Sequence, residues 1–493
     1  MIQLYNTLTK TKERLISRNE KKIQMFVCGP TVFDYIHIGN ARTFVFFDIV
    51  AKYLRSQKYE LDYIQNITDI EDKIITRAKE NNRESLEYAK EYYEKFKEDI
   101  KALGVDSPKY IPATEHIEQV VNQVKTLIDK GHAYLIEGDG YYFDLSTFKN
   151  YGKLSGRKAQ MADDAISRID ENSKKKNKGD FCLWKLSKDG EPAWDFKTTK
   201  YLGIVGVKGT PGSRSSEISN GSAESGQSEL SLPGRPGWHI EDTAITEHYF
   251  GPQYDIHGGG QDLIFPHHEA EITQQESASG KKPFVKYWMH VAFLINKDEK
   301  MSKSKGNFMT VHELFKKHSK EVLRFYLLSG FYRSPLEYSE AMLKQSHAAI
   351  NRISEFIQKL DRVDGRDNRE ADICLHDTKE KFSVAMDNDF NTPEAFGVVF
   401  EMIRTLNPLL IENKISKKQS EEIISFLKEI NSILGIIPAE QQKIPAEIQG
   451  LVEKREKIRQ DKNYEESDKI RTQIHDLGWE VEDTIYGPLP NKI

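Results

Sequence analysis

One motif suited to handling a phosphate is His37-Ile38-Gly39-Asn40, between a β-prone run at 23–27 and a helical pattern at about 41–55. The start of a helix presents backbone N–H groups and a positive dipole end to an anion. His37 can donate to the charge that develops on a phosphate, and Gly39 lets a nucleotide lie close to the backbone. Alone the motif is weak evidence, because a histidine in such a setting is more often a structural residue.

A second motif is the pentapeptide Lys300-Met301-Ser302-Lys303-Ser304, which follows strand-like residues 288–295. Two lysines and two hydroxyls on a loop of small residues can clamp a triphosphate whose charge spreads in the transition state. A solvated basic loop is the alternative interpretation. A complete pentapeptide at the end of a β-run is nevertheless far more specific than the first motif.

A third element is a run of three glycines, Gly258 to Gly260, after strand-like residues 254–256. The glycines permit close approach of a ligand to the backbone, and Asp262 just beyond them can accept hydrogen bonds from ribose hydroxyls. A glycine turn with a capping aspartate is the alternative interpretation. The three elements together favour a site for a nucleotide with a triphosphate.

His267 and Glu271 are candidates for a metal site. They are four residues apart, which would place them on one face of a helix at a spacing that metal ligands use. On spacing alone, an exposed pair of neighbours on a helix surface is the more common outcome. The chain has no Cys-x-x-Cys pair that would add a zinc site elsewhere.

These residues need a parallel sheet to bring them together. The run at 23–27, the helical pattern at about 41–55 and the β-prone run at 61–67 predict a βαβ unit, with a ligand crevice at the strand carboxyl ends. A long insertion follows, and strand-like runs then resume at 238–240, 254–256 and 288–295. The N-terminal half therefore predicts an α/β fold.

The C-terminal half is predicted to be helical. Thr310 and Glu313 form a capping box, Gly330 is a plausible end of that helical segment, and helical periodicity continues to about 435. Pro438 and Pro445 mark a linker before a charged helix in the tail.

Composition bounds the class of protein. A length of 493 residues predicts several cores, and the formal net charge is −5. No apolar run reaches the ~18–20 residues of a membrane span, and charged residues interrupt any signal-peptide pattern at the N-terminus. Three scattered cysteines, Cys28, Cys182 and Cys374, suit a reducing compartment. We expect a cytoplasmic protein without a membrane segment.

The three motifs together resemble the signatures of class I aminoacyl-tRNA synthetases, and the chain is most similar to the cysteinyl-tRNA synthetase family. The resemblance runs from about Leu4 to the final Gly487-Pro488, with only the Ser-rich loop outside it. It is carried by Phe26–Pro30, Asn66–Ile70, Asp180–Lys185, Arg235–Glu241, Asp262–Glu271, Lys300–Ser304 and Met386–Pro393.

The resemblance implies roles for particular residues. The implied catalytic residues are His37, Asn40, Lys300 and Lys303, and the implied ATP-binding residues are Gly29, Pro30, Thr31, Gly39, Gly259, Gly260, Asp262, Ser302 and Lys303. The implied amino-acid-binding residues are Cys28, Thr68 and Trp238, and the implied zinc ligands are Cys28, Asp242, His267 and Glu271. Mg²⁺ is expected with the ATP.

Two positions depart from the family pattern. Asp242 stands where the family has a second cysteine ligand; the formal charge with Zn²⁺ is unchanged, but oxygen is a harder ligand than sulfur. Asn40 stands where the class motif ends in histidine, and it keeps a donor. Zinc would explain the choice of cysteine, since a thiol ionises to a soft ligand and an apolar pocket separates near-isosteres by only ~10²-fold.

The implied fold is a Rossmann-type parallel-sheet catalytic domain split by an insertion, followed by a helical bundle and a small anticodon-binding domain. The expected catalytic halves are 1–114 and 236–309, separated by an insertion at 115–235 that contains a flexible Ser/Gly-rich loop at 207–234. A stem-contact region at 310–345, a helical bundle at 346–440 and an anticodon-recognition domain at 441–493 follow.

The implied reaction attaches L-cysteine to tRNA(Cys) through a cysteinyl-adenylate. Residues 297–333 contain nine basic and four acidic side chains, a local charge of +5 that suits an acceptor stem, although a charged surface helix is the alternative. In the tail, tyrosine can stack on an unpaired base, and arginine and aspartate can read base edges. The implied anticodon residues are Arg459, Tyr464, Asp468, Arg471 and Asp483, for which a salt-bridged surface helix is the alternative.

Two other functions stay open. A cysteine ligase on the same catalytic half could join cysteine to an amino-sugar, but such relatives lack an anticodon-binding tail. A synthetase-derived RNA-binding protein without catalysis should have lost the ATP motifs. We expect a monomer, because no long apolar heptad or exposed apolar stripe calls for a partner.

Overall fold

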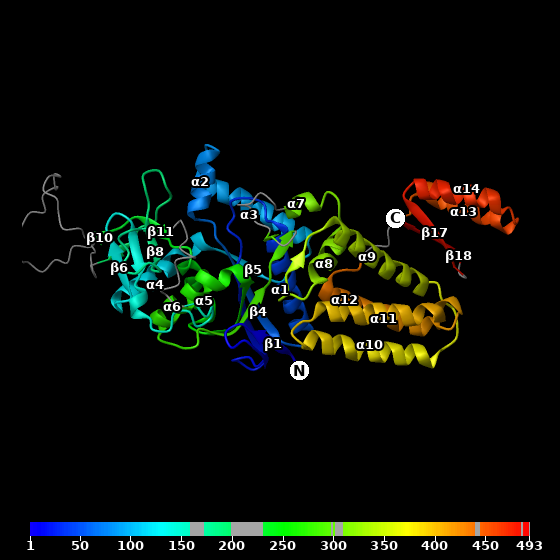
Figure 1. Ribbon diagram of the computed structural model, residues 1–493, viewed down its shortest axis with the longest axis horizontal. Coiled ribbons are helices and arrows are strands. Elements are labelled where there is room, and N and C mark those ends of the chain that lie inside the picture. The colour runs from blue at the N-terminus through cyan, green and yellow to red at the C-terminus, as the bar shows by residue number, and fades with distance from the viewer. Residues whose placement is uncertain are drawn as a thin grey trace, which may run out of the picture.

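The computed structural model describes residues 1–157, 172–198, 230–296, 299–300, 309–438, 444–484 and 487–492. The molecule is elongated, with strands and helices mixed in one half, a bundle of helices in the other, and a small red domain beyond the bundle (Figure 1). The element order confirms the predicted α/β architecture followed by helices.

A five-stranded parallel sheet forms the centre of the α/β half. Its order is β13-β12-β3-β4-β5, with bounds Val285–Val291, Tyr254–Gly260, Lys22–Val27, Glu60–Ile67 and Lys109–Pro112. Helix α1 (Ile38–Ser56) connects β3 to β4, which confirms the predicted βαβ unit. Because the strands are parallel, the loops that follow them meet at one edge, and β12 brings the segment after the insertion beside β3.

Helix α1 holds the first motif against that edge. It begins at Ile38 rather than near 41, because the Nδ1 atom of His37 caps it by accepting from the N–H of Asn40 at 3.2 Å. Its close approach to β12 depends on Gly258, where a Cβ atom would stand 2.2 Å from the ring of Phe47.

The predicted insertion forms a second, antiparallel sheet of order β11-β8-β7-β6. Its strands are Gly234–Pro236, Phe181–Leu186, Gly140–Phe143 and Ala133–Ile136, and helix α4 (Ile117–Asp129) precedes them. The strand predicted at 238–240 is wrong, since α5 (Ile240–Phe250) begins there. Glu241 and Asp242 in its first turn are favoured by the helix dipole, which outweighs the short apolar run. Most of the predicted loop at 207–234 lies outside the described residues.

The single strand predicted at 288–295 is two strands. Strand β13 ends at Val291, and β14 (Leu294–Asn296) pairs with β15 (Glu299–Lys300) and β16 (Leu336–Glu337) in a separate sheet. The buried guanidinium of Arg42 explains the break, because it binds the carbonyl groups of Ala292 at 2.9 Å and Phe293 at 3.1 Å. The chain turns there out of the central sheet.

The predicted capping box is confirmed, but it caps a short helix. Thr310 and Glu313 cap α7 (Val311–Leu314), and Ser319 caps the next helix, α8 (Lys320–Leu328). Four longer helices then form the bundle as far as Leu434: α9 (Glu340–Leu360), α10 (Arg369–Asp387), α11 (Thr392–Ile411) and α12 (Lys417–Leu434).

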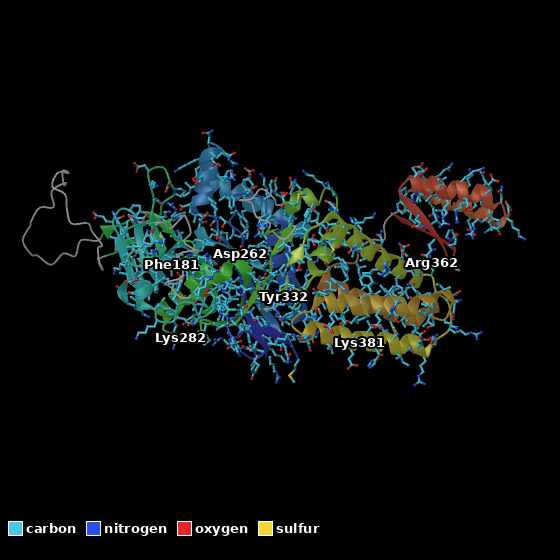
Figure 2. All side chains as sticks on the ribbon, in the orientation of Figure 1. Phe181, Asp262, Lys282, Tyr332, Arg362 and Lys381 are labelled. Carbon is cyan, nitrogen blue, oxygen red and sulfur yellow. The ribbon has the colours of Figure 1, made fainter. Side chains whose placement is uncertain are left out.

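The C-terminal domain consists of α13 (Ala446–Gln460), α14 (Tyr464–Asp476), β17 (Trp479–Thr484) and β18 (Gly487–Lys492). It contacts the end of α9, where Lys359 pairs with Glu482 at 2.8 Å and Arg362 donates to the carbonyl oxygen of Pro488 at 3.4 Å. Arg362 is labelled at this junction in Figure 2.

The remaining elements are β1 (Gln3–Asn6), β2 (Thr11–Arg14), α2 (Asp72–Glu80), α3 (Ser85–Ala102), α6 (Glu269–Ser279), β9 (Lys197–Thr198) and β10 (Leu230–Ser231). Helix α6 and its preceding turn follow β12 and complete the edge of the central sheet. Among the helices in the described part of the chain, none is both long and apolar enough to cross a bilayer.

Candidate active site and metal centre

A cavity of about 330 Å³ lies at the carboxyl edge of the central sheet. Loops after β3, β4, β12 and β13 line it, together with residues before and within the first turn of α5. The predicted site residues that line it are Cys28, Gly29, Pro30, Thr31, His37, Gly39, Asn40, Thr68, Trp238, Asp242, Gly260, Asp262 and His267.

The other predicted residues are not among those that line the cavity. Glu271 is fully buried in α6, and Gly259 is in β12. Lys300 ends β15, whereas Ser302 and Lys303 lie outside the described residues. In the view of Figure 2, Asp262 appears between Phe181, in the sheet of the insertion, and Tyr332, whose ring stacks on Phe46 of α1.

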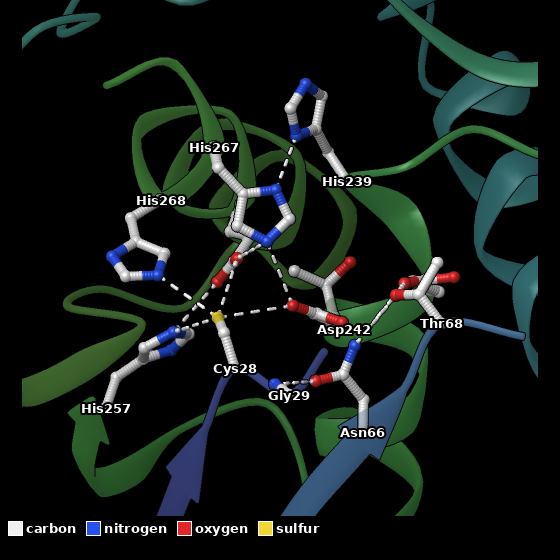
Figure 3. Close-up of polar contacts among 12 residues, drawn as sticks. Cys28, Gly29, Asn66, Thr68, His239, Asp242, His257, His267 and His268 are labelled. Atoms are coloured by element: carbon white, nitrogen blue, oxygen red, sulfur yellow. Dashed lines mark hydrogen bonds and ion pairs between the residues drawn. The ribbon is translucent and has the colours of Figure 1, made fainter. Parts of the chain in front are cut away.

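The floor of the cavity gathers a thiol, carboxylates and imidazoles (Figure 3). The Sγ atom of Cys28 lies 3.1 Å from Nε2 of His268 and 3.4 Å from Nε2 of His257. It lies 3.4 Å from Oδ2 of Asp242 and 3.9 Å from Oε1 of Glu271. These residues come from β3, β12, α5 and the segment around α6, so only the folded sheet brings them together.

His267 closes the group of four predicted ligands. Its Nε2 atom lies 3.0 Å from Oδ2 of Asp242 and 2.9 Å from Oε1 of Glu271. His268 is a further donor, because ligand atoms of Cys28, His267, His268 and Glu271 all lie within 4.8 Å of one another. The predicted ligands and this group of four have Cys28, His267 and Glu271 in common.

The group fits a bound divalent cation. Asp242 Oδ1 and Glu271 Oε2 are buried and have no hydrogen-bond partner among the described residues. Burial raises the pKa of the Cys28 thiol well above its ordinary value and that of Glu271 to about 7. Burial alone would lower the pKa of His267, but the carboxylates of Glu271 and Asp242 raise it to about 10. Nitrogen, oxygen and sulfur donors gathered in one buried group are a ligand set that zinc accepts.

A layer of aromatic partners orients the imidazoles whose Nε2 atoms face the group. Burial lowers the pKa of His239, His257 and His268, so these rings are neutral. Such outer partners fix the tautomer and direction of a metal-binding ring. The Nδ1 atom of His267 lies 2.7 Å from Nδ1 of His239, and that of His268 lies 2.8 Å from Nε2 of His290. The Nδ1 atom of His257 lies 2.6 Å from the hydroxyl of Tyr254.

Sequence reasoning did not single out His239, His257 or His268. One signal was available in the glycine run, since a Cβ atom on Gly259 would stand 2.9 Å from Cε1 of His268. The glycine leaves room for an imidazole as well as for a ligand. His268 lies within Asp262–Glu271, one of the stretches that carry the family resemblance, but the resemblance implies no role for it.

The rim of the cavity carries the first motif. A Cβ atom on Gly39 would stand 2.9 Å from Nδ1 of His37, so the glycine leaves the imidazole in place. Because that Nδ1 accepts from the N–H of Asn40, the neutral ring carries its proton on Nε2 and can donate from there. The rim therefore presents one imidazole donor at the start of a helix.

The wall between rim and floor is polar on one side and aromatic on the other. The N–H of Gly29 donates to Oδ1 of Asn66 at 2.6 Å, and both Asn66 and the hydroxyl of Thr68 donate to the buried Glu241. The ring of Trp238 also lines the cavity and stacks on His267 with centroids 4.4 Å apart. The arrangement suits a small polar ligand held above the metal group.

Comparison with known proteins identifies the family. Residues 15–201 and 222–348 match the catalytic domain of the class I (C) tRNA synthetases, and residues 381–438 match the DALR domain. The chain is 39% identical to the cysteine–tRNA ligase of Clostridioides difficile, over 99% of each chain. It is 40% identical to that of Caldicellulosiruptor saccharolyticus over the full length of both.

The chain belongs to the cysteine–tRNA ligase family of class I aminoacyl-tRNA synthetases. Its fold is shared more widely. A methionyl-tRNA synthetase of Mycobacterium tuberculosis, solved with methionyl-adenylate, superposes with a TM-score of 0.57 at 15% identity, over 84% of this chain and 90% of that one. A LeuRS of Agrobacterium radiobacter K84, solved with tRNA and LeuAMS, gives 0.59 at 10% identity over 84% of each.

The predicted anticodon residues of this family member lie on the C-terminal domain. Arg459 is near the end of α13, Asp483 is in β17, and α14 carries Tyr464, Asp468 and Arg471. Arg459 and Asp483 form an ion pair at 2.5 Å, and the Tyr464 ring is 60% exposed.

The basic segment at 297–333 is less basic at the surface than its count suggests. Arg324 is fully buried and pairs with Asp48 at 3.0 Å, and Arg333 pairs with Asp389 at 2.9 Å. The prediction counted both toward a surface charge, but each of these two cations is paired with an aspartate, and Arg324 is buried. Lys316 and Lys317, which the structure describes, remain exposed on this segment.

Proposed function

We propose that the chain attaches L-cysteine to tRNA(Cys) in two steps, at the expense of ATP. The observation that carries the proposal is the cavity itself, which joins a phosphate-handling helix start at its rim to a metal-binding group at its floor. Membership of the cysteine–tRNA ligase family supports the same activity.

In the first step, a carboxylate oxygen of cysteine attacks the α-phosphate of ATP, and pyrophosphate leaves. His37 donates from Nε2 to the charge that grows on the phosphate, and the Asn40 side chain assists from the same side. Lys300 and Lys303 would balance the charge that develops on the phosphates, and Mg²⁺ would be bound with the ATP. Gly29, Gly39, Gly260 and Asp262 accommodate the nucleotide.

The floor selects the amino acid. Cys28, Asp242, His267 and Glu271 would hold one zinc ion, and the buried Oδ1 of Asp242, which has no hydrogen-bond partner among the described residues, supports that assignment. When bound, the ion supplies a soft Lewis acid that favours a thiolate over the alcohol of serine. Thr68 and Trp238 would hold the rest of the amino acid between floor and rim.

In the second step, a hydroxyl of the terminal ribose of tRNA attacks the carbonyl carbon of the adenylate, and AMP leaves. The C-terminal residues Arg459, Tyr464, Asp468, Arg471 and Asp483 would recognise the anticodon. We infer a monomeric cytoplasmic enzyme with domain boundaries at 114, 235, 309, 345 and 440.

Two alternative functions predict different results in one assay. A ligase that joins cysteine to an amino-sugar would activate cysteine but transfer it to a sugar amine. An RNA-binding protein without catalysis would not activate cysteine. The tail domain disfavours the first alternative and the intact rim disfavours the second.

Cysteine-dependent ATP–pyrophosphate exchange, followed by transfer to tRNA(Cys), tests the proposal. We expect exchange without tRNA, transfer when tRNA is added, and discrimination against serine beyond the ~10²-fold that pocket shape alone supplies. Absence of exchange would overturn the activity, and exchange without transfer to tRNA would point to the amino-sugar ligase. Zinc analysis of the same sample should give one ion per chain.

A further inference from the structure

Arg455, a residue outside the predicted set, lies at the centre of the proposed anticodon-reading surface. Its side chain extends from α13 and is only 2% exposed. Its guanidinium makes a two-pronged contact with Asp483, from Nη1 to Oδ1 at 2.7 Å and from Nη2 to Oδ2 at 2.9 Å. Arg459, one helical turn further along α13, pairs with the same Oδ1 at 2.5 Å.

A buried arginine is not expected to stabilise this small domain better than an apolar residue would. The hydrophobic core here consists of Ile448, Val452, Ile470, Ile474, Trp479 and Val481. Desolvating a guanidinium costs free energy that even a good ion pair only offsets, and an apolar side chain of similar volume often serves stability as well or better. The Nε atom of Arg455 is moreover buried without a partner among the described residues. Stability alone therefore does not account for this residue.

The contact does fix the direction and charge of the Asp483 carboxylate. The hydrogen bonds from Arg455 hold the pKa of Asp483 below its ordinary value, so the carboxylate stays ionised. A two-pronged contact also fixes the plane of the carboxylate, which a single hydrogen bond would leave free to rotate. Asp483 remains 34% exposed and Arg459 33% exposed, so each keeps an outer edge toward solvent.

The geometry leaves acceptor and donor capacity for a ligand. An ionised carboxylate offers roughly four lone-pair sites, and the contacts to Arg455 and Arg459 use three of them within the described part of the chain. The remaining capacity lies at Oδ2. A base edge with amino or imino N–H groups can donate to such an oxygen, while the outer N–H groups of Arg459 can donate to a base or phosphate oxygen.

We propose that Arg455 is the positioning residue of this surface: it holds Asp483, and through it Arg459, in the orientation that reads one unpaired base. The inference rests on the proposed function, since it requires that the domain meets a tRNA anticodon. It adds a residue that itself does not touch the RNA. The alternative is that Arg455 only ties β17 to α13.

Two substitutions in the full-length chain separate these roles. Arg455→Lys keeps the charge but loses the two-pronged contact, and Arg455→Met keeps the stem in the core without the charge. Lys454→Met is the matched control, because it removes a cation from the exposed side of the same helix. Amide hydrogen exchange of peptides from α13, α14 and β17 reports whether the domain stays folded in each variant.

The decisive measurement is kcat/KM for charging tRNA(Cys) transcripts with the native anticodon and with each anticodon base replaced in turn. We expect both Arg455 variants to lose about 10- to 100-fold on the native transcript, mainly through KM, and to become nearly indifferent to replacement of one base. Cysteine-dependent pyrophosphate exchange without tRNA should be unchanged, and Lys454→Met should keep the wild-type preference.

Three outcomes would overturn the proposal. They are folded Arg455 variants that keep the wild-type preference at every base, an equal loss in Lys454→Met, and a domain that unfolds in both variants, which would make Arg455 a folding residue. Lack of pyrophosphate exchange in the wild type would instead contradict the proposed function, so the two failures are distinguishable.

Discussion

The floor of the cavity and the C-terminal domain both contain buried charged groups, and they differ in how that charge is balanced. On the floor, the carboxylates of Asp242 and Glu271 converge on the thiol of Cys28 and on the imidazole of His267. In the C-terminal domain, the guanidinium of Arg455 meets both oxygens of Asp483. The first group places two carboxylates around one imidazole, and the second pairs one carboxylate with guanidinium groups.

The difference shows which region needs a ligand to be complete. The raised pKa of His267 lets its imidazolium balance one of the two carboxylates, but burying the second without a counter-charge is costly, so the floor favours a cation from outside the chain. The pair in the tail is balanced by the protein itself and is available before RNA arrives. We therefore expect substitutions on the floor to weaken metal binding without changing RNA binding, and substitutions in the C-terminal domain to do the reverse.

The largest effect is expected for Cys28→Ala on the floor. Removing the only thiol in the group should weaken metal binding by more than the roughly 10- to 100-fold that loss of an outer partner costs. Elemental analysis after dialysis should then find little metal, and cysteine-dependent exchange should fall in parallel. Affinity for an anticodon stem-loop should not change.

Cys182→Ala provides the control for that substitution. Cys182 is also buried, but it lies in β8 of the insertion and packs against Tyr134 and Tyr142. It should keep stoichiometric metal. Retention of a full metal complement by Cys28→Ala would contradict the metal assignment of the floor.

A smaller effect is expected for His239→Phe. Loss of the contact between Nδ1 of His239 and Nδ1 of His267 should reduce metal affinity by about 10- to 100-fold, because the ring loses the partner that fixes its tautomer. Metal competition against a chromophoric chelator measures the change. His132→Phe is the control, since His132 stacks on Phe143 outside the group. Equal affinity in both variants would indicate that His268, rather than His267, holds the ion.

The fold was largely predictable because its signals are local. The βαβ unit follows from apolar runs and helical spacing within residues 23–67, and the capping box of Thr310 and Glu313 is confirmed. One error arose where a distant group decides the outcome. The strand at 288–295 divides because Arg42, from α1, takes the carbonyl groups of Ala292 and Phe293.

The site residues that belong to a motif could be predicted, whereas residues that act through packing contacts could not. The resemblance brought Cys28, Asp242, His267 and Glu271 together, and the structure places them in mutual contact. His239 and Arg455 act only through the residues they touch, from other elements of the chain. Such partners leave no spacing signal, since a turn before α5 and a loop before α6 set the distance between His239 and His267.

A further test of the floor is Asp242→Cys, which should strengthen zinc binding. A thiolate is a softer ligand than a carboxylate, and a gain of about 10-fold corresponds to about 1.4 kcal/mol. With Co²⁺ in place of zinc, the thiolate-to-metal absorption band should grow relative to wild type. Thr246→Cys adds a thiol one turn further along α5 and should leave the band unchanged. An unchanged band in Asp242→Cys would show that residue 242 is not a ligand.

The smallest effects should appear as opposite pH dependences of local stability. In the metal-free chain, Glu271 has a folded pKa of about 7, above its ordinary 4.5. Its protonated form therefore stabilises the folded state below pH 4.5, and this stabilisation is lost as the pH rises through 7. Asp483 has a folded pKa below its ordinary 3.8. Its ionised form therefore stabilises the folded state above pH 3.8, and this stabilisation is lost as the pH falls below that value. Hydrogen exchange, corrected for its intrinsic pH dependence, should show α6 opening more readily from pH 5 to 8 and β17 from pH 5 to 3. Adding zinc should reverse the trend in α6 only, because the ion binds the deprotonated ligands; parallel trends in both regions would contradict the distinction between them.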